Sequence, residues 1–236
     1  MKKSKIIWVK NLTLVCLIIL GIMSNINAGT VTENKTYVYL TFDDGPSEYT
    51  EKLLDILHKY NMKATFFMLR DEMLRYPQMV NRMIQEGHAV GIHGVTHEKC
   101  QFYKNVDSPL NEMNDANKAL FEVSSCNTKL IRTPYGSIPY LTKEQEAKLT
   151  NEGYVIWDWN IDSRDWCYRN PGKTFNQVIK SLKACNRDTK VILLHDIKFV
   201  NETMELIGKW MKENAYESKP ITIDLQAVRL INYKKK

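Results

Sequence analysis

The chain has 236 residues, of which 44% are hydrophobic and 25% are charged, as in an ordinary globular protein with one sizeable core. This composition excludes a disordered chain, a collagen-like repeat and a polytopic membrane protein. The formal net charge is +6, but four lysines and no acid precede residue 28. The remainder carries only +2, so nothing in its charge points to a nucleic-acid partner.

The first 28 residues have the pattern of a secretory signal peptide. Four lysines precede an apolar stretch from Leu12 to Met23, and Ala28 offers a small residue for cleavage. The stretch is about a dozen residues long, shorter than the roughly 20 needed to cross a bilayer. We therefore expect cleavage after residue 28 and a secreted or cell-surface protein. A segment that is not cleaved would anchor the protein to the membrane.

From residue 36 onward, short β-rich runs alternate with amphipathic helical stretches. The predicted strands span residues 37–40, 64–68, 89–92, 129–131, 154–157, 191–194 and 221–223. The predicted helices span residues 47–60, 77–86, 108–123, 143–151, 175–184 and 202–213. No repeat or Pro/Gly-rich linker divides the chain, so we expect a single α/β domain over residues 29–236, built on a parallel sheet.

Unusual polar residues come directly after the predicted strands in five separate units. In a barrel, the loops after all strands converge on one face, whereas an open sheet gathers fewer of them at its crevice. The placement therefore favours a barrel-like fold with a site at that face. The residues are Asp43 and Asp44, His93 and His97, Arg132, Asp162 and Asp165, and His195.

Asp44, His93 and His97 together suit a metal ion. Two imidazoles four positions apart and one carboxylate from another unit form a ligand set that leaves a coordination position open for water or substrate. Gly91 and Gly94 indicate a loop rather than a helix around the histidines. The adjacent aspartates could instead make a turn or a helix cap, although a cap needs only one of them.

The chain resembles the polysaccharide deacetylases of carbohydrate esterase family four through five motifs in order. They span residues 41 to 196 and consist of Thr41–Pro46, His93–His97, Arg132–Gly136, Asp162–Trp166 and Leu193–Asp196. The resemblance implies a single distorted (β/α) barrel that removes acetyl groups from N-acetylated sugars with a divalent metal, usually zinc.

The resemblance also implies the main catalytic roles. Asp43 is the general base, and Asp44, His93 and His97 hold the metal. His195 is the general acid that protonates the leaving amine.

Five further residues have supporting roles by the same resemblance. Arg132 pairs with the base and keeps it charged, and Asp165 orients the acid and favours its protonated form. Tyr135 offers its backbone N–H to the oxyanion, and Trp166 and Leu193 form the pocket for the acetyl methyl group. From the residues alone, Arg132 could equally be a structural ion pair, and Trp166 and Leu193 could be core side chains.

One position departs from the family pattern. The family generally has Ser or Thr directly after the first metal histidine, where this chain has Gly94. Thr96 is a candidate to replace the missing hydroxyl. We expect that Gly94→Ser preserves or raises metal affinity by restoring a hydrogen bond, unless Gly94 has a positive φ that opposes the added Cβ.

The resemblance leaves several polysaccharides open as substrate. N-Acetylglucosamine residues of peptidoglycan are the leading expectation, because the chain has an export signal and one domain. Chitin oligomers, or acetyl-xylan with ester cleavage, are alternatives that keep the mechanism. A barrel that binds glycan without turnover is a different class, and the presence of both Asp43 and His195 argues against it. Beyond the polysaccharide we expect no nucleic acid and no stable protein partner, and we expect a monomer.

Four cysteines remain after the signal segment, which are too few for a disulfide scaffold of this length. Three pairings are possible, and free thiols fit the sequence equally well. The four residues are Cys100, Cys126, Cys167 and Cys185.

Overall fold

The computed structural model describes residues 36–230, which belong to one compact unit beginning at Lys35. The signal peptide predicted over residues 1–28 lies outside this part of the chain. The strands are β1 Thr36–Asp43, β2 Ala64–Leu69, β3 Ala89–Gly94, β4 Leu130–Ile131, β5 Val155–Ile156, β6 Ile161–Asp162, β7 Val191–His195 and β8 Tyr216–Ser218. The helices are α2 Thr50–Lys59, α3 Arg70–Arg75, α4 Pro77–Gln85, α5 Lys99–Phe102, α6 Ser108–Ser124, α7 Lys143–Asn151, α8 Asp165–Tyr168, α9 Pro171–Ala184 and α10 Val200–Glu213.

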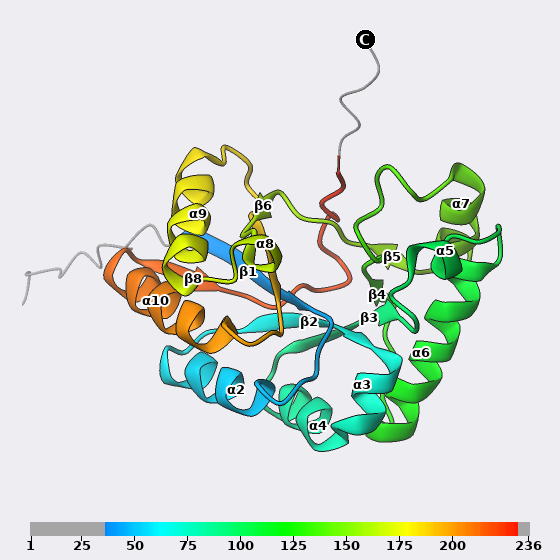
Figure 1. Ribbon diagram of the computed structural model, residues 1–236, viewed down its shortest axis with the longest axis horizontal. Helices are drawn as coiled ribbons and strands as arrows, with labels where there is room; N and C mark the ends of the chain where they lie inside the picture. The colour runs from blue at the N-terminus through cyan, green and yellow to red at the C-terminus, as the bar shows by residue number, and fades with distance from the viewer. Residues whose placement is uncertain (1–35, 231–236) are drawn as a thin grey trace, which may run out of the picture. The chain divides into compact units, whose positions relative to one another are not determined.

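The strands form one parallel sheet in the order β5-β4-β3-β2-β1-β7-β6, with β8 paired to the first residues of β1. The sheet is curled and helices cover its outer side (Figure 1). Its edge strands β5 and β6 do not pair with each other, so the barrel is open on one side. None of the helices within residues 36–230 combines the length and apolarity that a membrane span needs.

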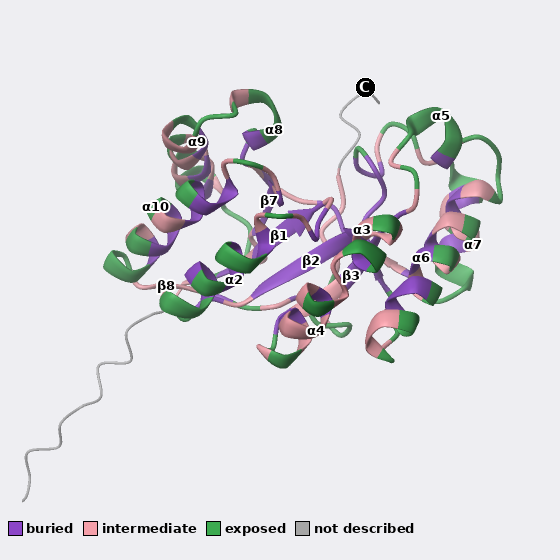
Figure 2. Ribbon diagram, turned by 60° about the horizontal axis from the view of Figure 1, so that its bottom comes forward, coloured by how far each residue is buried: buried purple, intermediate pink, exposed green. Residues whose placement is uncertain are grey.

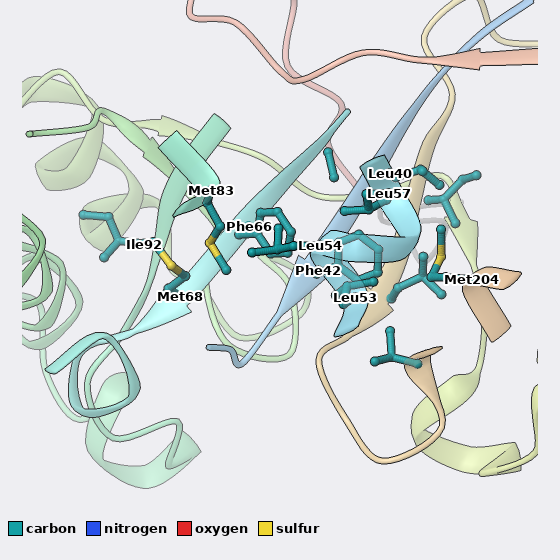
Figure 3. Packing of buried hydrophobic residues seen from close by; sticks show 14 of the residues in the cluster. Leu40, Phe42, Leu53, Leu54, Leu57, Phe66, Met68, Met83, Ile92 and Met204 are labelled. Atoms are coloured by element: carbon teal, nitrogen blue, oxygen red, sulfur yellow. The ribbon is translucent and has the colours of Figure 1, made fainter. Parts of the chain in front are cut away.

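The main core lies between the outer face of the sheet and the surrounding helices. Side chains alternate between the two faces of a strand, so Leu40 and Phe42 point toward the helices, where Phe42 stacks on Phe66 with ring centroids 5.3 Å apart. Figure 3 shows these residues beside Leu53 and Leu54 of α2. Figure 2 shows buried strands inside and helices exposed along their outer faces. The intervening positions of the strands are thereby left for the interior of the barrel.

Residues 157–160 bridge the gap between β5 and β6. The Trp157 N–H donates to the carbonyl of Ile131 at 2.8 Å, and the Asn160 N–H donates to the carbonyl of Val191 at 3.2 Å. The Trp157 side chain is fully buried in a smaller cluster with Phe67 and Val191. This bridge brings backbone carbonyls of residues 157 and 158 inside the barrel, next to the strand ends.

The strand predicted over residues 221–223 is wrong. Pro220 has no N–H and cannot continue the ladder in which Lys219 N donates to the Val38 carbonyl at 3.0 Å. Ile221 is still buried, and its N–H donates to the Thr65 hydroxyl at 2.8 Å. The strand at this end of the chain is β8, which precedes the proline.

The four cysteines among the described residues are free thiols. Cys100 and Cys167 are exposed, and Cys126 and Cys185 are partly buried. No disulfide therefore contributes to the fold over residues 36–230.

Candidate active site

The carboxyl ends of the parallel strands gather the residues that the sequence singled out. The register pairs Asp43 at the end of β1 with His195 at the end of β7, and it pairs Ile92 with Ile131, directly before His93 and Arg132. A cavity of about 800 Å³ opens at this end. Of the residues that the sequence placed at this face, Asp43, Asp44, His93, His97, Tyr135, Asp162, Trp166, Leu193 and His195 line it.

Asp44, His93 and His97 bring their ligand atoms within 4.8 Å of one another. The Nε2 atoms of both histidines lie 3.5 Å from Asp44 Oδ1. Nδ1 of His93 lies 2.7 Å from the carbonyl of Arg132. Because a carbonyl can only accept, this nitrogen carries the proton and Nε2 keeps its lone pair for a metal.

Two observations show that this cluster fits a divalent cation. Asp44 Oδ1 is buried and has no hydrogen-bond partner within the described residues, and a buried carboxylate oxygen in that state is costly unless a cation compensates it. Burial and the nearby His93 lower the pKa of His97, which favours the neutral ring that metal coordination requires. Two imidazole nitrogens and one carboxylate suit a divalent transition-metal ion with a coordination position left open.

Asp43 presents its two carboxylate oxygens to different neighbours. The side chain is buried, with 2% of the residue exposed. Oδ1 accepts from Arg132 Nη1 at 2.8 Å, whereas Oδ2 lies 3.8 Å from Nε2 of the metal-site His93. One oxygen is thus held by the Arg132 guanidinium, and the other borders the candidate metal cluster of Asp44, His93 and His97.

Arg132 is fully buried, and the bridge across the open barrel satisfies its guanidinium. Nε donates to the carbonyl of Trp157 and Nη2 to the carbonyl of Asp158, each at 3.0 Å. Nη1 also donates to the Thr41 hydroxyl at 2.7 Å, and the guanidinium lies 4.3 Å from the centroid of the Phe67 ring. A buried charge is tolerated only with such complete pairing, so the fold fixes Arg132 rigidly beneath Asp43.

His195 and Asp165 form a second pair on the opposite side of the cavity. Asp165 Oδ1 accepts from His195 Nδ1 at 2.7 Å, and Oδ2 accepts from the backbone N–H of the same histidine at 2.7 Å. Burial opposes the charge on the ring, but the hydrogen bond and charge of Asp165, with Asp43 and Asp44, outweigh it and raise the pKa of His195 to about 9. The ring is therefore an imidazolium at neutral pH, with Nε2 left to face the cavity.

Tyr135 has a strained backbone that leaves one donor free. Its φ is 64°, and its N–H donates to no group within residues 36–230. Tyr103 holds the loop from below, with its hydroxyl 2.7 Å from the carbonyl of Pro134 and 3.1 Å from that of Gly136. The Tyr135 hydroxyl donates to the carbonyl of His97 at 2.9 Å, which ties this loop to the metal cluster.

Trp166 and Leu193 lie on the apolar wall of the cavity. Leu193 is buried, while Trp166 is 55% exposed and is the more open of the two. The same wall includes Ile138, Pro139, Tyr140, Trp159, Ile197 and Phe199. A second hollow of about 410 Å³ also borders Asp44 and His97. Asp44 and His97 therefore border both hollows.

Two buried aspartates support the site although the sequence analysis gave them no role. The first is Asp196, whose Oδ1 accepts from the Ser47 hydroxyl at 2.8 Å and whose Oδ2 accepts from the Thr50 hydroxyl. A Cβ at Gly45 would lie 2.5 Å from Oδ2, so only glycine fits there. Asp196 belongs to the fifth motif, and that membership was the signal for it.

The second is Asp158, which binds the loop after Tyr135. Its carboxylate accepts from the backbone N–H of Ser137 at 2.9 Å, from the Ser137 hydroxyl at 2.5 Å and from the N–H of Leu230 at 3.0 Å. It directly follows the strand predicted over residues 154–157. The sequence analysis selected polar residues that come directly after predicted strands, and the same criterion would have found Asp158.

The structure argues against the expectation for Gly94→Ser. Gly94 has a φ of +97°, which residues with a side chain rarely adopt. An added Cβ would lie 3.0 Å from Phe102 and 3.1 Å from Glu112 Oε2. The loop also has a hydroxyl bond already, since Thr96 Oγ1 donates to Glu112 at 2.8 Å. Glycine is therefore required by the backbone at this position.

Comparison with known proteins decides the family. The family model described as "Polysaccharide deacetylase" matches residues 30–154. The chain belongs to the polysaccharide deacetylase family. It is 44% identical to YheN of Bacillus subtilis over 76% of this chain and 64% of that protein. It is 36% identical to a peptidoglycan-N-acetylglucosamine deacetylase of Bacillus cereus over 78% of this chain and 69% of that protein.

The fold also agrees with this polysaccharide deacetylase family. The crystal structure of the polysaccharide deacetylase Bc1974 from Bacillus cereus matches with a TM-score of 0.72 and 36% sequence identity. The match covers 80% of this chain and 92% of that one. The distorted (β/α) barrel predicted for a polysaccharide deacetylase is thereby confirmed.

Proposed function

We propose that this protein is an exported, metal-dependent hydrolase that removes N-acetyl groups from N-acetylglucosamine residues of peptidoglycan. The observation that carries the proposal is the buried, unpartnered Asp44 oxygen between two histidine nitrogens, bordered by a carboxylate and, across the cavity, by a charged histidine. The printed name of the Bacillus cereus relative, peptidoglycan-N-acetylglucosamine deacetylase, supports the choice of sugar.

Asp44, His93 and His97 would hold the divalent ion, with zinc as the proposed metal. A bound ion would act as a Lewis acid that polarises the acetyl carbonyl and lowers the pKa of a water molecule. The chain has to supply a base, an oxyanion donor and an acid.

Asp43 acts as the base in this proposal. Arg132 holds its Oδ1, and Oδ2 on the side of the metal cluster accepts the proton of the attacking water. The free N–H of Tyr135 donates to the oxygen that becomes negatively charged as water adds to the acetyl carbon.

His195 completes the reaction as the acid. Its protonated Nε2 donates a proton to the amide nitrogen as the C–N bond breaks, which releases acetate and the free amine of the sugar. Leu193 and Trp166 give the acetyl methyl group an apolar surface beside this histidine. The two hollows that Asp44 and His97 border leave room for a sugar chain that continues past the reacting residue.

The test is incubation of the protein with peptidoglycan, chitin oligomers and acetyl-xylan, followed by measurement of released acetate and product masses. We expect acetate from peptidoglycan, with the mass loss on N-acetylglucosamine. Chelator should abolish the release, and added zinc should restore it. Faster release from chitin oligomers or from acetyl-xylan would reassign the substrate. Absence of acetate from all three with zinc present would indicate a glycan-binding barrel without turnover.

Export is tested separately from the reaction. We propose that residues 1–28 are removed on export and that the secreted or cell-surface protein acts as a monomer. N-terminal sequencing of the protein from culture medium and from membranes should give a mature chain that starts at residue 29. An intact N-terminus in the membrane fraction would show an anchor instead.

A further inference from the structure

The loop between the two metal histidines is held by a carboxylate from helix α6. Oε2 of Glu112 accepts from the backbone N–H of Val95 at 2.9 Å and from that of Thr96 at 3.0 Å. Its Oε1 accepts from the Thr96 hydroxyl at 2.8 Å. We propose that Glu112 is a positioning residue for the metal site, which acts through this loop and sets the affinity for the ion. The inference rests on the metal site of the proposed function.

Glu112 and Gly94 fit each other. A Cβ at residue 94 would come within 3.1 Å of Glu112 Oε2, so the absence of a side chain there lets the carboxylate reach the two N–H groups. In this chain the carboxylate of Glu112 therefore holds the loop. A serine or threonine at residue 94 would have offered a single hydroxyl for that purpose.

The backbone of Glu112 belongs to helix α6, and this helix is anchored in the core. Three other residues of the helix are buried, namely Met113, Ala116 and Leu120. Helix α6 packs against β3, the strand that carries His93 (Figure 1). The carboxylate therefore ties the loop to the same rigid unit that holds the first metal histidine.

The second histidine needs this support because its backbone is strained. His97 has a φ of 49°, which lies in a region that residues other than glycine rarely adopt. The Thr96 hydroxyl that donates to Glu112 also accepts from the N–H of Glu98 at 3.2 Å. The hydrogen bonds centred on Glu112 therefore lie on both sides of His97 and hold it in the position where its Nε2 meets Asp44.

Removal of the carboxylate would leave two backbone N–H groups and one hydroxyl without their acceptor. The loop can then relax, and His97 no longer has one fixed orientation. Interactions that orient metal ligands typically change metal affinity by about 10–100-fold. The effect should appear in the binding of the metal itself, with no substrate present.

The experiment measures the zinc dissociation constant of the full chain by competition with a chromogenic chelator, with the absorption spectrum of the cobalt-loaded protein as a second readout. Glu112→Ala should bind zinc about 10–100-fold more weakly and change the cobalt spectrum. Glu112→Gln keeps an oxygen for the backbone N–H groups and should recover most of the affinity. Glu122→Ala is the matched control, since Glu122 is exposed on the same helix and its side chain makes no hydrogen bond or ion pair within residues 36–230.

Zinc affinity of Glu112→Ala within twofold of the parent, or an equal loss in Glu122→Ala, would overturn the inference. If Glu112→Ala does not fold, Thr96→Val decides, because it removes the hydroxyl with its bonds to Glu112 and to the Glu98 N–H, keeps the Glu112 side chain, and should still weaken zinc binding. Unchanged binding in Thr96→Val would then count against Glu112. A parent protein that binds no zinc would overturn the metal site itself, which separates failure of the proposed function from failure of this inference.

Discussion

At the scale of single residues, Asp43 combines two tasks on its two oxygens. Replacement by Asn removes the proposed base but keeps an oxygen for Arg132. We expect Asp43→Asn to bind zinc with unchanged affinity and to lose roughly 10²–10⁴-fold in kcat. The free energy of unfolding should fall by less than the roughly 3–5 kcal/mol of a buried pair that loses one partner entirely. Loss of zinc from the variant would instead make Asp43 a ligand.

The pKa of His195 leads to a prediction for how kcat depends on pH. Its pKa is raised to about 9, chiefly by Asp165 acting against burial. In the proposed reaction the protonated ring is the acid, so kcat should decline as pH rises through this value. Asp165→Asn removes the charge that holds the proton, and the decline should move toward the ordinary histidine value of about 6.5.

The measurement is kcat against pH for the parent and for Asp165→Asn. Asp162→Asn is the control, because Asp162 Oδ1 accepts only from the N–H of Arg164 and makes no bond to His195. A decline at the same pH in the parent and in Asp165→Asn would show that His195 is not the acid.

At the scale of the elements, the loop after β3 yields the third prediction. Gly94→Ser places a side chain on a residue with a φ of +97°, against Phe102 and Glu112. The backbone conformation alone costs about 1–2 kcal/mol. We expect a lower melting temperature and weaker zinc binding. Val95→Ala is the control, since it changes the same loop without an added Cβ. Zinc binding that equals or exceeds that of the parent would restore the missing-hydroxyl interpretation.

Long elements with a clear periodicity could be predicted from the sequence, and so could the short strands β4 and β5, whereas the short elements α3, α5, α8, β6 and β8 could not. Helix α7 occupies the predicted residues 143–151 because Thr142 and Gln145 form a capping box there. Helix α9 begins at Pro171 rather than at residue 175, because Asn170 caps it and proline suits the first turn. Strand β6 has two residues, too few for any pattern of alternation.

The candidate site was more predictable than the fold around it. Its residues lie after strands, so the order of the strands alone brings them to one face. The contacts that hold them depend on distant segments, as when Glu112 reaches Val95 or Asp158 reaches Leu230. Pairs of that kind leave no periodic signal in a single sequence, because the residues next to each partner in the chain do not indicate which distant residue it contacts.

At the scale of the whole molecule, Asp158 connects the bridge across the open barrel to residues 137 and 230. Asp158→Ala leaves buried donors without an acceptor, at roughly 1–3 kcal/mol for each. We expect the midpoint of urea unfolding to fall and kcat to drop with it, because the Tyr135 loop loses its support. Asp188→Ala, at an exposed position, should change stability by less than about 0.5 kcal/mol. Equal midpoints in the two variants would show that the bridge does not need Asp158.

The place of β1 in the sheet has a consequence for how the protein acquires its structure. β1 is early in the chain but central in the sheet, and its partner β7 follows about 150 residues later, with Thr41 opposite Leu193 and Asp43 opposite His195. Contacts between such distant segments slow folding, because a long loop must close before they form. A chain that emerges from its amino end can pair β1 with β2 early, but the edge of β1 that faces β7 stays unpaired until residue 195 has followed. Asp43 and His195, the proposed base and acid, meet only when β7 pairs with β1, so we expect no deacetylase activity from a nascent chain that ends before residue 195.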